Sequence, residues 1–168
     1  MVRLLGIDPG LRFTGWGVID VEGNRLRHVE NGVIATNSAD SVPDRLKVLH
    51  ENLLILIERL NPAEAAVEET YVNRNGTATL KLGYARGIAL LAPALAGLHV
   101  AEYGALAVKK AVVGTGSADK DQVEMMVRRL LPGVKVARTD ASDALAIAIC
   151  HAHHRASARH IAAGVRMA

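Results

Sequence analysis

Apolar and polar positions along the chain predict three strands before the first helix. Residues 2–8 are mostly apolar and end at Asp8, and Pro9-Gly10 follows with residues that favour a turn. Residues 14–21 and 25–35 carry apolar positions over strand-like lengths. Because the connections between these segments are short, we expect the three strands to form an antiparallel meander.

The rest of the chain alternates between helical and strand patterns. Residues 41–44 have the composition of a helix start, and leucines then recur at three- and four-residue spacing as far as Leu60. A short apolar strand at 65–67 should run parallel to the first strand, because a helix precedes it. The later elements expected are a loop at 71–77, a helix to about residue 96, a strand at 99–103, and helices at about 105–113, 119–131 and 139–156.

This order of elements predicts one α/β domain. It describes a mixed sheet of about five strands with helices on both faces. That topology is the ribonuclease H-like arrangement, and periodicity alone does not exclude other α/β folds. The domain is expected to occupy residues 1–156, with a flexible tail at 157–168.

Composition supports an ordinary globular domain. Of 168 residues, 50% are hydrophobic and 22% are charged, which excludes a disordered or fibrous chain. The single cysteine, Cys150, lies in an apolar run, so it is expected to be buried and to form no disulfide within the chain. Neither a signal peptide pattern nor a membrane-length apolar run is present, so the expected location is cytoplasmic.

Charge is distributed unevenly along the chain. Residues 1–70 contain 7 Lys and Arg against 11 Asp and Glu, whereas residues 71–168 contain 13 against 6. A basic half suits a polyanionic partner if its charges share one face. A GC-rich genome is an alternative explanation, because Arg outnumbers Lys 14 to 6, and charge alone does not separate the two.

Four acidic residues occupy positions that suggest one site. Asp8 and Glu68 each end an apolar strand, and Asp140 and Asp143 are three apart at the start of a predicted helix, on one face. Each alone could be a turn, cap or solvated residue. Together they indicate a carboxylate cluster, which requires a cation, and oxygen ligands favour Mg²⁺ or Mn²⁺ over zinc. Two such ions would support phosphodiester hydrolysis.

The sequence contains nine short blocks whose order and spacing are informative. They are Gly6-Ile-Asp-Pro-Gly10, Thr14-Gly-Trp-Gly17, Ala66-Val-Glu68, Leu80-Lys-Leu-Gly83, Ala85-Arg-Gly87, Val108-Lys109, Val112-Val-Gly114, Lys120-Asp-Gln-Val123 and Asp140-Ala-Ser-Asp-Ala-Leu-Ala-Ile-Ala148. In order and spacing, the series resembles the RuvC family of Holliday junction resolvases from about residue 4 to residue 151.

The resemblance implies roles for six residues. Asp8, Glu68, Asp140 and Asp143 match the catalytic carboxylates, which would hold two Mg²⁺ ions per subunit, with Mn²⁺ as a substitute. Lys109 and Lys120 match basic residues that the family places near the cleaved phosphate. Glu69, the neighbour of the catalytic Glu, should point away from the site by strand alternation.

The resemblance also implies contacts with DNA. Tyr71 matches an aromatic that reaches toward unpaired bases at the junction centre, where stacking is worth about 1–3 kcal/mol per base. A partly buried structural tyrosine is the alternative. Arg74, Lys81 and Arg86 are further candidate phosphate contacts, beside Lys109 and Lys120.

The activity implied is symmetric, paired nicking of four-way DNA junctions by a homodimer, in recombination and repair. The products would carry 5′-phosphate and 3′-hydroxyl ends. A branch-migration motor of the RuvA and RuvB type is the partner that the family implies. No nucleotide cofactor is expected, because residues 114–120 lack the spacing of a phosphate-binding loop.

Three other functions compete with this hypothesis. An actin-like ATPase or sugar kinase shares the first hairpin motif, but it needs a second domain. A junction-binding protein without catalysis would lack one of the carboxylates, and a different ribonuclease H-like nuclease would not explain Tyr71 and the two lysine blocks. The histidines near the C-terminus are expected on a solvated helix surface, with DNA-backbone contact as the second interpretation; they are His151, His153, His154 and His160.

Overall fold

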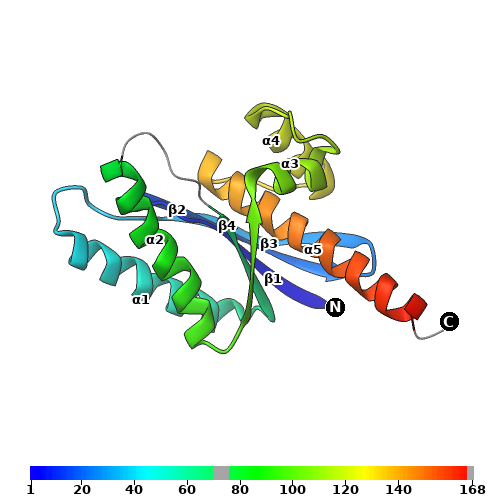
Figure 1. The fold of residues 1–168 in the computed structure, drawn as a ribbon, viewed down its shortest axis with the longest axis horizontal. Helices are drawn as coiled ribbons and strands as arrows, with labels where there is room; N and C mark the ends of the chain where they lie inside the picture. Colours follow the sequence, from blue (N-terminus) through cyan, green and yellow to red (C-terminus); the bar gives the residue numbers. More distant parts are fainter. Residues whose placement is uncertain (70–75, 166–168) are drawn as a thin grey trace.

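One five-stranded sheet organises the chain (Figure 1). The computed structural model describes residues 1–69 and 76–165, with side chains as far as residue 157. Its elements are β1 (Val2–Asp8), β2 (Phe13–Glu22), β3 (Arg25–Ala35), α1 (Val42–Leu60), β4 (Glu64–Glu69), α2 (Gly76–Leu95), β5 (His99–Gly104), α3 (Ala105–Val113), α4 (Lys120–Leu130) and α5 (Thr139–Val165). The strand order is β3-β2-β1-β4-β5.

The pairing of the strands confirms the predicted mixed sheet. β1 with β2 and β2 with β3 are antiparallel, whereas β4 lies parallel to both β1 and β5. The carboxyl ends of β1, β4 and β5 therefore meet at one edge of the sheet. The start of β2 lies at the same edge, because Asp8 pairs with Gly15.

Helices cover both faces of the sheet, as predicted. In Figure 1, α1 and α2 lie on one side of the strands, and α3, α4 and α5 lie on the other. Side chains alternate between the two cores along β1, where Leu4 packs toward α5 and Leu5 packs toward α1. This double burial explains why β1 is apolar almost throughout.

Helix α5 lies unusually close to the sheet because glycines lie beneath it. A Cβ atom added to Gly6 would lie 2.0 Å from the carbonyl oxygen of Ala144, and one added to Gly15 would lie 2.0 Å from that of Asp140. Only residues without a side chain allow this approach. The first turns of α5, with Asp140 and Asp143, are thereby placed against β1 and β2.

Two predicted boundaries require correction. Helix α2 begins at Gly76, within the segment 71–77 for which a loop was expected, and α5 continues to Val165 instead of ending at Ala156. The helix therefore includes much of the segment for which the sequence predicts a tail, because helical periodicity beyond the core is weak. None of the helices in the described residues is long and apolar enough to cross a membrane.

Candidate active site

A pocket of about 290 Å³ opens at the sheet edge where β1 and β4 end. Its polar lining consists of Asp8, Glu68, Lys109, Lys120 and Asp143, and its apolar lining comes from α3, α4 and α5. These are five of the six residues predicted to be catalytic. A larger hollow of about 710 Å³ lies at the opposite end of the sheet, but no carboxylate cluster of this kind lines it.

The local fold explains how the first two carboxylates meet. The Thr14 hydroxyl donates a hydrogen bond to the Gly10 carbonyl oxygen, 2.7 Å away, and so closes the turn after Asp8. Ile7 pairs with Val67 across the parallel β1–β4 ladder, so the residues that follow, Asp8 and Glu68, emerge side by side. Strand alternation places Glu69 differently, and it does not line the pocket.

Asp8 and Glu68 are held in an environment that disfavours charge. Burial raises the pKa of Asp8 to about 8, and repulsion from Glu68, Asp143 and Asp140 adds to the effect. Burial also raises the pKa of Glu68, although the hydrogen bond with Asp8 and the charges of nearby lysines oppose the rise. The hydrogen bond between the two carboxyl groups raises the pKa of Asp8 and lowers that of Glu68.

The other two carboxylates are paired with basic side chains. The Lys120 ammonium lies 3.2 Å from Asp143, and Arg138 Nε lies 3.5 Å from Asp140. Burial raises the pKa of Asp143 despite the opposing effect of Lys120, and the same ion pair raises the pKa of Lys120. Both acids are therefore oriented by partners that a substrate or metal would have to displace.

The donor set fits a hard divalent cation. Carboxylate oxygens are the ligands that Mg²⁺ prefers, and a cation between Asp8, Glu68 and Asp143 would offset the burial and the carboxylate repulsion that raise their pKa values. Within residues 1–69 and 76–165, no three acidic, histidine or cysteine side chains are already arranged as a metal cage. Asp143 and Asp140 are instead paired with Lys120 and Arg138.

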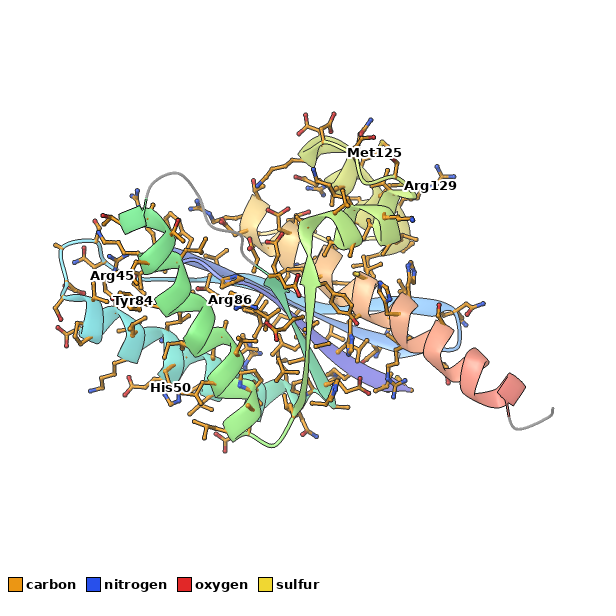
Figure 2. All side chains as sticks on the ribbon, viewed as in Figure 1. Arg45, His50, Tyr84, Arg86, Met125 and Arg129 are labelled. Carbon is orange, nitrogen blue, oxygen red and sulfur yellow. The ribbon has the colours of Figure 1, made fainter. Side chains whose placement is uncertain are left out.

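Arg86 has contacts that the sequence did not predict. Its Nε donates to the Glu68 carbonyl oxygen, 3.2 Å away, and its Nη2 pairs with Glu102. In Figure 2, Arg86 and Tyr84 leave α2 on opposite sides. Arg86 as a phosphate contact stays a prediction, but the observed contacts favour a role in holding the end of β4.

Of the remaining residues predicted to contact DNA, the structure describes only Lys81. Lys81 is exposed on α2, in keeping with its predicted contact, which stays a prediction. Tyr71 and Arg74 lie outside the described residues.

One prediction about the C-terminal histidines is wrong. His151 is 4% exposed, with Nε2 2.9 Å from Glu64 and Nδ1 2.9 Å from the Tyr103 hydroxyl. Burial lowers its pKa, although the hydrogen bond with Glu64 opposes the fall. The error arose because α5 packs on the sheet beyond Cys150, which is buried as predicted. His153 and His154 are exposed, and the side chain of His160 is not described.

Three residues outside the pocket lining, one of them paired with Asp140, were missed by the sequence analysis. Arg12, Phe13 and Arg138 form a stack in which both guanidinium groups lie against the aromatic ring. The available signal was their position, since Arg12 lies four residues after Asp8 and Arg138 two residues before Asp140. Proximity along the chain did not reveal that the two arginines meet.

Comparison with known proteins agrees with this geometry. The family model described as crossover junction endodeoxyribonuclease RuvC matches residues 4–151. Proteins of that name from Gluconacetobacter diazotrophicus and Gluconobacter oxydans are 74% and 70% identical over 168 residues, covering 100% of both chains in each case.

A solved structure extends the similarity to three dimensions. Thermus thermophilus RuvC in complex with a Holliday junction substrate has a TM-score of 0.88 and 34% identity, covering 94% of this chain and 97% of that one. The match covers nearly the whole of both chains, and the ribonuclease H-like fold is common to both. This chain therefore belongs to the RuvC family of crossover junction endodeoxyribonucleases.

Proposed function

We propose that this chain resolves four-way DNA junctions by paired, symmetric nicks, as a Mg²⁺-dependent endonuclease. The observation that carries the proposal is the meeting of Asp8, Glu68 and Asp143 with Lys109 and Lys120 in one pocket. Family membership supplies the substrate class, because the Thermus thermophilus relative was solved with a Holliday junction. Each nick would leave a 5′-phosphate and a 3′-hydroxyl, which a ligase can seal.

The four carboxylates would hold two Mg²⁺ ions per subunit, with Mn²⁺ as a substitute. These residues are Asp8, Glu68, Asp140 and Asp143. When bound, Mg²⁺ supplies positive charge to the phosphate and lowers the pKa of the attacking water. The side chains of this protein would hold the DNA, orient the carboxylates and balance the negative charge on the phosphate.

Lys109 and Lys120 would balance the negative charge that grows on the phosphate during hydrolysis. Lys120 extends from the start of α4, and its ammonium is 3.2 Å from Asp143. An ammonium has three donors, so Lys120 can contact a phosphate oxygen as Asp143 turns inward. Loss of one such donor typically lowers kcat by about 10²–10³-fold.

A homodimer would match the two-fold symmetry of a four-way junction. Helix α2 presents an exposed stripe without charged residues, opposite its buried alanines. This stripe, termed the α2 stripe below, consists of Leu80, Gly83, Tyr84, Gly87, Leu91 and Leu95. A Cβ atom added to either glycine would meet no atom within 4 Å, so a second helix could approach closely there. We therefore propose a second copy of this chain as its occupant.

Further proposals follow from the family. Tyr71 would stack on an unpaired base at the junction centre, and Arg74 would contact a phosphate nearby. A branch-migration motor of the RuvA and RuvB type would deliver the junction, in the cytoplasm, and the nuclease itself would use no nucleotide cofactor.

The decisive experiment compares a labelled four-way junction with a matched linear duplex. Wild type and Asp8→Asn are each incubated with Mg²⁺ and with EDTA. Symmetric nicks on the junction alone, lost with EDTA or Asp8→Asn while binding persists, support the proposal. Equal cutting of the duplex would indicate a general nuclease, and binding without cutting would indicate a junction-binding protein.

A further inference from the structure

Phe13 holds two guanidinium groups against its ring at the sheet edge where the carboxylates meet. The Cζ atom of Arg138 lies 4.1 Å from the ring centroid, and that of Arg12 lies 5.2 Å from it. At these distances the ring attracts both cations. Arg12 and Phe13 follow the turn after Asp8, and Arg138 precedes Asp140. The three residues, termed the arginine cluster, are connected to the proposed metal ligand Asp140 through Arg138.

The backbone around the arginine cluster is held by specific hydrogen bonds. The Asn31 carboxamide on β3 accepts from the Ala137 amide and donates to the Lys135 carbonyl oxygen, each at 2.9 Å. On the other side, Arg12 uses its carbonyl oxygen to accept from the Thr36 amide at 3.0 Å. The cluster is thus attached at both ends to β3 and its continuation. Its position is determined by the fold and not by side-chain packing alone.

Fold stability does not account for two arginines at this place. The pair between Arg138 and Asp140 is 3.5 Å long, with side chains 53% and 32% exposed. Ion pairs as exposed as this contribute at most about 1 kcal/mol to stability. Among the described residues, none forms a hydrogen bond or ion pair with the Arg12 guanidinium. The cluster therefore carries positive charge that its neighbours do not balance.

Stacked guanidinium groups are suited to a phosphate. The ring occupies the flat face of each group and leaves its N–H edge for an oxyanion, which Arg binds through two parallel hydrogen bonds. Because Phe13 already orders both side chains, less rotamer entropy is lost when an anion binds. A duplex or junction arm placed over the pocket presents phosphates on both sides of the one that is cut.

We infer that the arginine cluster binds backbone phosphates of the DNA next to the phosphate that is cut. The inference rests on the proposed function and adds to it a substrate-binding site formed by Arg12, Phe13 and Arg138. It also explains why Arg138 is paired with Asp140 before DNA binds. When Asp140 turns toward the metal site, Arg138 loses its carboxylate partner and contacts a DNA phosphate.

Salt-dependent binding tests the inference without relying on cleavage. Dissociation constants for a labelled junction and for a matched linear duplex are measured by fluorescence anisotropy, in EDTA, across a range of KCl concentrations. The test protein is the double variant Arg12→Gln/Arg138→Gln. The control is Arg25→Gln/Arg129→Gln, which removes the same charge from exposed positions. Arg25 lies at the opposite end of the sheet, and Arg129 at the far end of α4 from Lys120 (Figure 2).

The slope of log Kd against log salt falls by about 0.9 for each DNA phosphate that the protein ceases to neutralise. We expect it to fall by about 1 to 2 in the double variant on both DNAs, and to change by less in the control. An unchanged slope in the double variant, or an equal fall in the control, overturns the inference. A wild type that shows no preference for the junction over the duplex would instead contradict the proposed function. A preference that is lost only in the double variant would overturn the inference, because the arginine cluster is inferred to bind backbone present in both DNAs.

Discussion

Arg86 donates a hydrogen bond from Nε to the backbone carbonyl oxygen of Glu68, 3.2 Å away. Its Nη2 pairs with Glu102 on β5, so one side chain connects α2 with the ends of two neighbouring strands. The same helix presents the α2 stripe, which we propose as the dimer interface. Arg86 therefore provides a direct connection between that interface and a proposed metal ligand.

Replacing Arg86 with Gln should lower kcat by about tenfold, because small displacements of a catalytic group have large effects on rate. The Kd for the junction and its salt dependence should stay close to those of wild type, since Arg86 acts here as a positioning residue. Single-turnover cleavage and anisotropy measure the two quantities. Lys47→Gln, an exposed position on the neighbouring helix α1, is the control. A weaker salt dependence with unchanged kcat would instead identify Arg86 as a phosphate contact.

Asp8→Asn should abolish cleavage and yet stabilise the metal-free protein. Burial and three neighbouring carboxylates disfavour the charged form of Asp8, whose pKa is raised to about 8. An amide of the same shape carries no charge at any pH and can donate a hydrogen bond to Glu68. Urea unfolding in EDTA should give a free energy of unfolding higher by about 1 kcal/mol, as is common when a functional site is neutralised. A destabilised Asp8→Asn with an unchanged m-value would contradict this explanation.

Asp20 should make the fold sensitive to acid. It is buried, and its carboxylate accepts from Arg3 at 2.8 Å and from Arg27 at 2.7 Å. The hydrogen bond from Arg3 is the largest cause that lowers its pKa below the ordinary 3.8. Since the folded state binds the proton less readily, the stabilisation is present above pH 3.8 and is lost as the pH falls through the lower, folded pKa.

The Asp20→Asn variant tests that pH dependence. At pH 7 it should lower the free energy of unfolding by about 1–3 kcal/mol, because it removes hydrogen bonds to charged donors. The difference from wild type should shrink as the pH falls below 3.8. Chemical denaturation from pH 2 to pH 7 would measure it, with the exposed Asp40→Asn as control. A difference that stays constant across this range would exclude the ion pair as its cause.

Gly15→Ala should impair cleavage through helix α5. The added Cβ would lie 2.0 Å from the Asp140 carbonyl oxygen, so the start of α5 must move away from β2. We expect a loss of about 1–3 kcal/mol in stability from overpacking. The displacement of Asp140 should lower kcat by about 10–100-fold. Gly76→Ala, where the added atom meets nothing within 4 Å, should retain stability. Normal kcat in Gly15→Ala would mean that Asp140 is not needed at its present position.

The sequence predicted those features that depend on local pattern. Strand ends placed Asp8 and Glu68 at one sheet edge, and helical spacing placed Asp140 and Asp143 on one face. These expectations needed only periodicity and one topological rule, that parallel neighbours end at the same edge. The element order and the mixed sheet followed for the same reason.

Features that depend on docking could not be predicted in this way. His151 lies in a polar-looking stretch, and its burial follows from the packing of α5 on β4 and β5. The hydrogen bond of Arg86 with Glu68 joins residues 18 positions apart, and the stack of Arg138 on Phe13 joins residues still more distant in the chain. The sequence suggested a phosphate contact for Arg86 because the residue is basic and lies near the active site. Its observed partners, Glu68 and Glu102, depend on how β4 and β5 pack against α2.

Introducing a charge into the α2 stripe should separate the proposed dimer. Leu91 is 47% exposed at the middle of a stripe without charges, so Leu91→Glu would bury a carboxylate in the interface. Ile55→Glu is the matched control, because Ile55 is a similarly exposed apolar residue on α1, outside the stripe. Analytical ultracentrifugation should find a monomer for Leu91→Glu and the wild-type mass for Ile55→Glu. The monomer should nick single strands of the junction without pairing the cuts, since the metal sites are no longer held about a two-fold axis. A dimer that persists in Leu91→Glu and is lost in Ile55→Glu would place the interface on α1 instead.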